Sequence, residues 1–130
     1  MKKRSVKILV IKESIGYSAT TTFEKRFIGT EAETFEEIKA GILEALNFTF
    51  EGHDIIYNLK DIRFEFDLES FFDFYKVINA KALSERIGMN QSLLAQYIKG
   101  IKKPSPAQIK RILKGVHQIG MELTEVKFLI

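Results

Sequence analysis

The stretch Ala82–Pro104, ALSERIGMNQSLLAQYIKGIKKP, decides how the C-terminal half of the chain folds. A helix is expected over Lys81–Ile87, where apolar residues recur at helical spacing. Gly88 follows it and suits a helix end that needs positive φ. Asn90 can cap a second helix, Gln91–Lys99, by accepting from backbone N–H groups in its first turn. These signals predict a helix-turn-helix; the alternative is an ordinary helical hairpin punctuated by glycine and proline.

The outward face of the second helix is polar. In a DNA-binding helix-turn-helix, residues at the N-terminus of this helix point at base edges, and a glutamine can pair with adenine. Lysines at the start of the first helix and after the second suit phosphate contacts. Tyr97 could stack on a base, but its spacing from Leu93 and Leu94 favours packing in the core. The candidate DNA-binding residues are therefore Lys81, Asn90, Gln91, Ser92, Gln96, Lys99, Lys102 and Lys103.

This stretch resembles the Cro/repressor-type helix-turn-helix family, and the resemblance extends over roughly Leu68 to Leu123. It implies an all-α domain that binds operator DNA as a dimer. The features that match in register are Leu83, Arg86-Ile87-Gly88, Gln91-Ser92, Tyr97, Gly100, Lys102-Lys103-Pro104 and a helix after Ser105.

The charge of the chain is divided between its halves. Residues 1–70 hold 10 Lys/Arg and 13 Asp/Glu, whereas residues 71–130 hold 10 Lys/Arg and 4 Asp/Glu. No acidic residue lies between Arg86 and Met121. A basic run is often only a solvated face, but here it overlies the predicted helix-turn-helix, which favours a nucleic-acid-facing half.

The N-terminal half reads as an antiparallel sheet with one packed helix. Val6–Ile11 is almost continuously apolar, Ile15–Phe23 alternates with polar residues, and Lys25–Thr30 predicts a third, shorter strand. A capping box, Thr34 to Glu37, opens a helix with one apolar face. The alternation over Ile62–Leu68 predicts a last strand. We therefore expect an α+β fold with domains over residues 1–67 and 68–130.

The N-terminal pattern is similar to that of the HicB antitoxin family, which commonly carries a helix-turn-helix behind this domain. The resemblance rests on Gly16-Tyr17-Ser18-Ala19, Gly29-Thr30 and Thr34-x-x-Glu37. It implies a degenerate ribonuclease-H-like domain that binds and neutralises HicA, a small mRNA-cleaving toxin, while the second domain represses the operon. Many HicB sequences have a Pro-Gly-Cys-like turn where this chain reads Phe23–Phe27, so a shorter loop is expected.

Catalysis and metal binding are not expected. A ribonuclease-H site needs several carboxylates around Mg²⁺, whereas the first strand has no acid and only Glu13 at its end. The chain has no cysteine, and His53 and His117 lack acidic partners at ligand spacing. We expect no cofactor and no enzymatic activity. The acidic cluster at the start of the predicted helix either complements the helix dipole or attracts a basic toxin; its members are Glu31, Glu33, Glu36 and Glu37.

Two further expectations concern the C-terminal tail and the cellular location of the protein. In the tail Thr124–Ile130, the apolar residues Val126, Phe128 and Ile130 occupy every second position. This pattern predicts a short strand that pairs with the same strand of a second copy, in a homodimer or higher oligomer. The apolar run Ile8–Ile11 is too short for a signal peptide, and no segment reaches membrane length. We expect a cytoplasmic protein without membrane contact. The alternative function is a stand-alone transcriptional regulator whose N-terminal domain dimerises or senses a ligand.

Overall fold

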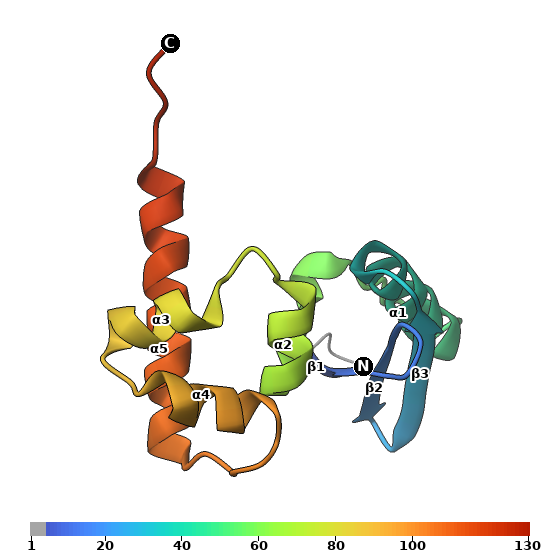
Figure 1. Cartoon of the computed structure of the whole chain (residues 1–130). Helices are drawn as coiled ribbons and strands as arrows, with labels where there is room; N and C mark the ends of the chain where they lie inside the picture. The colour runs from blue at the N-terminus through green and yellow to red at the C-terminus, as the bar shows by residue number, and fades with distance from the viewer. Residues whose placement is uncertain (1–4) are drawn as a thin grey trace. The chain divides into compact units, whose positions relative to one another are not determined.

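The computed structural model describes residues 5–130 and has an α+β fold (Figure 1). The chain divides into two compact units, which meet in sequence between Phe74 and Tyr75. Unit 1 contains the sheet, and unit 2 contains three helices. In chain order the elements are β1 (Val6–Lys12), β2 (Tyr17–Phe23), β3 (Arg26–Ala32), α1 (Phe35–Thr49), the 3₁₀ turn η1 (Leu59–Asp61), β4 (Ile62–Phe66), α2 (Leu68–Phe74), α3 (Ala80–Ile87), α4 (Gln91–Ile98) and α5 (Pro106–Glu125).

The sheet is mixed, with strand order β3-β2-β1-β4. β1, β2 and β3 are antiparallel neighbours, whereas β4 runs parallel to β1, with Ile8 opposite Phe64. The prediction of an antiparallel sheet was therefore wrong for the last strand. The reason is the connection: α1 carries the chain from one edge of the sheet to the other, and such a crossover delivers a parallel strand.

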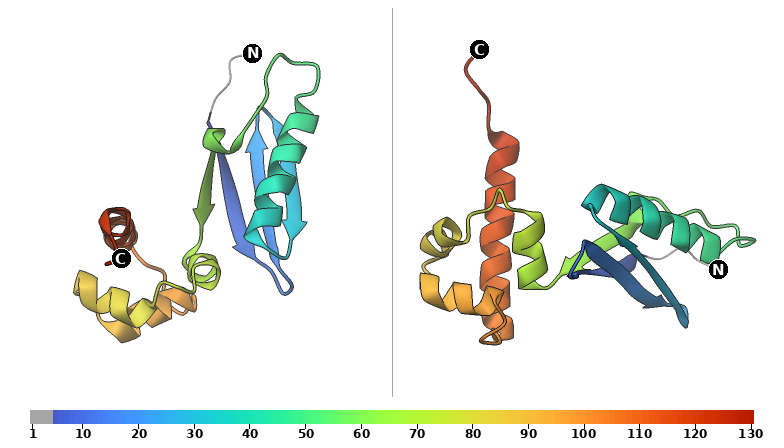
Figure 2. Two further views of the ribbon diagram at one scale, coloured as in Figure 1. Left: turned by 90° about the horizontal axis from the view of Figure 1, so that it is seen from above. Right: turned by 45° about the vertical axis from the view of Figure 1, so that its right-hand side comes forward.

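The core of unit 1 lies between α1 and one face of the sheet (Figure 2). β1 alternates strictly, so that Val6, Ile8 and Val10 are fully buried while Lys7 and Leu9 are exposed. α1 presents Ile38, Ile42 and Leu46 to these strands. The near-continuous apolar run in β1 therefore belongs to a strand with one buried face, not two.

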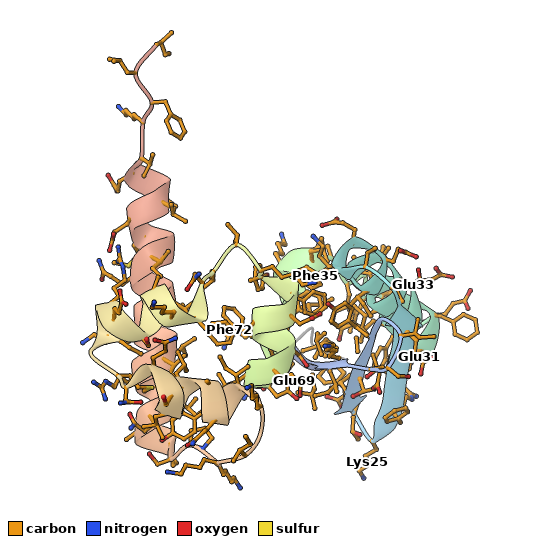
Figure 3. The ribbon with its side chains drawn as sticks, viewed as in Figure 1. Lys25, Glu31, Glu33, Phe35, Glu69 and Phe72 are labelled. Carbon is orange, nitrogen blue, oxygen red and sulfur yellow. The ribbon has the colours of Figure 1, made fainter. Side chains whose placement is uncertain are left out.

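The start of α1 has a clear local cause, whereas the β2–β3 turn forms against the usual preference of its residues. Thr34 caps α1 by accepting from the Glu37 N–H at 3.2 Å, and its hydroxyl donates to the Glu37 carboxylate at 2.9 Å. The β2–β3 connection is the short loop expected from the sequence. Glu24 and Lys25 form it, both with positive φ, in the tight hairpin geometry that glycine or asparagine usually adopts. Figure 3 shows Lys25 at the tip of this hairpin.

α2 packs on the sheet and belongs to unit 1. Ser70 accepts from the Lys12 N–H at 2.7 Å, and the Phe74 ring stacks on Tyr17 with centroids 3.7 Å apart. The sequence placed the boundary at Asp67, whereas the packing places it after Phe74. Asp67 caps α2 by accepting from the Ser70 N–H at 2.8 Å, and the aromatic side chains of α2 pack with the sheet unit.

Unit 2 consists of α3, α4 and α5. Ser105 caps α5 by accepting from the Gln108 N–H at 3.2 Å, and Pro106 occupies its first turn. α5 continues through Gly120 to Glu125, and residues 126–130 form no strand within the chain. Figure 1 shows the end of α5 and the tail projecting away from α3 and α4. The tail strand was predicted to pair with the tail of a second copy, so its absence from the single chain leaves that pairing a prediction.

Candidate nucleic-acid interface

The connection between α3 and α4 is held by caps on both sides. Gly88 ends α3 at φ 67°, and the Met89 N–H donates to the Ser84 carbonyl at 2.9 Å. Asn90 then caps α4, because its side-chain oxygen accepts from the Leu93 N–H at 3.1 Å. These hydrogen bonds satisfy backbone groups that helix ends leave unpaired. They fix the angle at which α4 leaves α3.

A small apolar core fixes which face of α4 is outward. Leu83 of α3, Leu94 of α4 and Ile112 of α5 are each no more than 2% exposed. Met89, in the turn, is buried among the same helices. Since Leu94 faces inward, the residues on the opposite side of α4 face solvent.

The outer face of α4 holds two of the candidate residues beside one groove. Gln91, Ala95 and Lys99 follow one another at intervals of four, so they share one face of the helix. Gln91 and Lys99, together with Lys81 near the start of α3, border a shallow groove. Its other lining residues are Ala80, Ala95 and Ile98. The structure therefore brings a glutamine and two lysines together over a mainly apolar floor.

The remaining candidates are not among the residues that line this groove, and they have different settings. Ser92 is exposed, whereas Gln96 is half-buried. The loop after α4 turns at Gly100, with φ 76°, and the N–H groups of Ile101 and Lys102 donate to the Gln96 carbonyl at 2.9 and 3.3 Å. Lys102 and Lys103 are exposed in this loop. Asn90 uses its side-chain oxygen as a cap, which leaves only its amide N–H groups to meet a ligand.

Two arginines that the charge pattern counted with the basic face are engaged within unit 2. Arg111 of α5 donates to the carbonyls of Ile87 at 2.9 Å and Gly88 at 2.6 Å, and so satisfies the C-terminus of α3. Arg86 forms two hydrogen bonds with Glu122, at 2.6 and 2.9 Å. These hydrogen bonds raise the pKa of the Arg86 guanidinium and lower the pKa of the Glu122 carboxyl. Sequence reasoning missed both roles, because each partner lies at least 23 residues away along the chain.

Unit 2 stays strongly basic with these two arginines engaged. Tyr75–Ile130 contains ten Lys/Arg and three Asp/Glu. The surface charge comes from lysines on α3, α4, α5 and the loop before α5. Such a surface attracts a polyanion over a distance of roughly one Debye length, about 8 Å at physiological salt.

Unit 1 has a different surface. The sheet face away from α1 carries Leu9 and Phe27, and the Phe27 ring lies over Gly29. β3 forms one edge of the sheet. Glu31 and Glu33, at its end, are exposed and project outward (Figure 3). Glu36 pairs with Lys39 at 2.6 Å and Glu37 takes part in the helix cap, so these two have local roles.

Neither a metal-ligand cluster nor a membrane-spanning helix is present among the residues that the structure describes. Over residues 5–130, His, Asp and Glu side chains form no group of three that could hold a metal ion. Glu13, the acid after β1, accepts from the Ser18 hydroxyl at 2.7 Å. None of the helices formed by these residues combines the length and apolar composition of a membrane span.

Comparisons of the chain with protein-family models, with curated proteins and with solved structures gave no match.

Proposed function

We propose that unit 2 is a helix-turn-helix module that reads DNA sequence with α4. The observation that carries the proposal is the outer face of α4, where Gln91 and Lys99 border one groove with Lys81 of α3. Glutamine is a base-reading side chain, and lysines beside it can hold the phosphates that set its register. Caps and a small core hold α4 rigidly, as a reading element requires.

In this proposal the candidate residues have separate roles. Gln91 and Ser92, in the first turn of α4, meet base edges, and Gln96 does so from the next turn. Lys81 and Lys99 contact phosphates on either side of the groove, and Lys102 and Lys103 extend this contact along the backbone. Arg86 and Arg111 only support the fold, since their guanidinium groups are already paired.

We propose further that unit 1 binds a protein toxin and that the chain is a HicB-like antitoxin repressing its own operon. Two features of unit 1 support a basic protein partner. The sheet face opposite α1 displays Leu9 and Phe27, and Glu31 and Glu33 stand at the end of the edge strand. Carboxylates at the rim of an apolar patch speed association with a basic partner.

Selection from a library of random DNA duplexes tests the first proposal without knowledge of the operator. The expected result is a single enriched sequence made of two inverted half-sites about one helical turn apart, roughly 34 Å. The matched control is the Gln91→Ala/Gln96→Ala chain, which keeps the lysines and should enrich that sequence much less than the wild type does. A wild-type library that remains random after repeated rounds would contradict DNA sequence reading.

Coexpression tests the second proposal. A short open reading frame adjacent to this gene, if it encodes a toxin, should arrest growth alone and not together with the full chain. The control is a chain with Leu9→Lys and Phe27→Lys, two exposed positions where a charge disturbs no core contact. This control should stay folded and lose protection. Growth arrest that persists with the wild-type chain would favour the stand-alone regulator.

A further inference from the structure

The second half of α5 and the tail form an apolar surface that no other part of the described residues, 5–130, covers. Ile112 and Gly115 of α5 are buried against α3, and Val116 and Ile119 are half-buried. Beyond Ile119 every residue is exposed, including Met121 at 61% and Leu123 at 65%. The tail adds Val126 and Phe128, also exposed. A terminal helix with so few contacts is marginal in water.

The exposed side of α5 is centred on His117. Leu113, four residues before it, is 50% exposed, and Met121 lies four residues after it. Residues spaced by four share one face of a helix. These three, with Lys110, Lys114 and Gln118, line a shallow groove along α5. We call this groove and its six residues the α5 outer face.

The charged residues of α5 are distributed unfavourably for the dipole of this helix. The first half carries Lys110, Arg111 and Lys114 and no acid, whereas the last turns carry Glu122 and Glu125 and no base. A lone helix is stabilised by the opposite arrangement, with acids at its N-terminus and bases at its C-terminus. Glu122 has Arg86 as a partner within the chain. The charge pattern of α5 therefore fits a second helix that runs in the opposite direction.

We propose that the α5 outer face is the contact between two copies of this chain, with the two α5 helices antiparallel and a two-fold axis at His117. In this register Leu113 of each copy lies against Met121 of the other. Lys110 is seven residues before the axis and Glu125 is eight residues after it, so they come level across the contact. The same self-complementary contact occurs twice, as two-fold symmetry requires.

The antiparallel register also determines where the tail lies relative to the second copy. Phe128 comes level with the first turn of the second copy's α5, beside the loop that holds Ile101, which is 69% exposed. Helix pairing thus replaces the strand pairing predicted from the alternation of the tail. The inference deepens the proposed function, because a two-fold dimer presents two copies of α4 to a palindromic operator.

Cysteine cross-linking tests the direction of the helices, since the chain has no cysteine of its own. Under mild oxidation His117→Cys should link to itself across the axis. Lys110→Cys should not link to itself, but should link to Glu125→Cys when the two variants are mixed. Self-linking of Lys110→Cys as rapid as that of His117→Cys would overturn the antiparallel arrangement.

Charge reversal provides an independent test by sedimentation equilibrium. Lys110→Glu and Glu125→Lys should each raise the dimer Kd about threefold to tenfold, because a lost exposed ion pair counts twice. The double variant should return close to the wild-type Kd, and Lys60→Glu, an exposed charge reversal in unit 1 outside the contact, should leave it unchanged. Each single reversal would stabilise a lone helix, so a monomeric wild type with stabilised variants would overturn the inference.

Both tests are made without DNA. Their failure would leave sequence reading by α4 intact, and a failure of the library selection would leave the dimer intact.

Discussion

At the residue scale, Tyr17 has a strongly perturbed ionisation. Burial, and then the hydrogen bond that its hydroxyl donates to Asp73, raise its pKa from 10.0 to about 12. Asp73 also pairs with Lys12 at 3.4 Å. Tyr17 therefore joins β2 to α2 through its ring and its hydroxyl together.

The shift predicts how stability depends on pH. The raised pKa means that the fold favours neutral Tyr17, so its contribution is complete below pH 10 and is lost as pH rises through about 12. Tyr17→Phe should remove this loss between pH 10 and 12, and should cost about 1 kcal/mol at neutral pH for one hydrogen bond. Denaturant unfolding of unit 1 at several pH values measures both. An unchanged alkaline slope would contradict the assignment.

Two glycines in α5 make a matched pair. A Cβ on Gly115 would lie 2.4 Å from the Ile87 side chain, whereas a Cβ on Gly120 would meet nothing within 4 Å. Gly115→Ala should destabilise unit 2 by about 1–3 kcal/mol through overpacking. Gly120→Ala should stabilise it by up to about 1 kcal/mol through helix propensity. Thermal unfolding compares them, and equal effects would contradict the packing of α5 on α3.

At the scale of elements, features that depend on local sequence were predicted better than features that depend on contacts between distant residues. The helix starts expected after Thr34, Asn90 and Ser105 are confirmed, because each of these caps acts within its own turn. α3 begins one residue earlier than expected, at Ala80, because Asn79 caps it. The parallel pairing of β4 and the attachment of α2 to the sheet depend on interactions such as that of Lys12 with Ser70, 58 residues apart. The spacing of residues along the chain cannot predict such interactions.

The candidate interface shows the same division. The outer face of α4 follows from its helical period, so Gln91 and Lys99 could be selected from sequence. Asn90 was selected both as the cap of α4 and as a DNA contact; the cap is confirmed, and the DNA contact stays a prediction. Arg86 and Arg111 were counted only as positive charge, because their partners become neighbours only in the folded unit.

Arg111 tests this supporting role. Arg111→Lys keeps the positive charge but removes the guanidinium group, which donates to the Ile87 and Gly88 carbonyls together. We expect unit 2 to lose about 1.5–3 kcal/mol of unfolding free energy, the contribution of a hydrogen bond that involves a charged group. Chemical denaturation gives the number, with Lys103→Arg as the conservative control. If Arg111→Lys is as stable as wild type, the arginine is not a cap for α3.

At the scale of the whole molecule, the division after Phe74 makes a prediction about fragments. A chain ending at Phe74 keeps α2 against the sheet and should unfold cooperatively. A chain ending at Asp67 loses Ser70 and Phe74, exposes the Tyr17 ring, and should be markedly less stable. Urea unfolding followed by circular dichroism distinguishes them. Equal midpoints would place the boundary back at Asp67.

The second whole-molecule consequence is a separation between sequence reading and charge attraction. Gln91 and Gln96 are assigned to bases, whereas Lys102 and Lys103 are assigned to phosphates. Removing a base contact should lower affinity for the chosen sequence alone. Removing phosphate contacts should lower affinity for every sequence and flatten the salt dependence.

The ratio of affinities for the enriched duplex and a shuffled duplex of the same composition measures this separation. For Gln91→Ala/Gln96→Ala the ratio should fall at least about tenfold, since each glutamine–adenine pair contributes about 1–3 kcal/mol of discrimination, while affinity for the shuffled duplex stays unchanged. For Lys102→Ala/Lys103→Ala the affinities for the enriched and the shuffled duplex should both fall, and their ratio should stay unchanged. Equal losses on both duplexes in the glutamine variant would contradict base reading by α4.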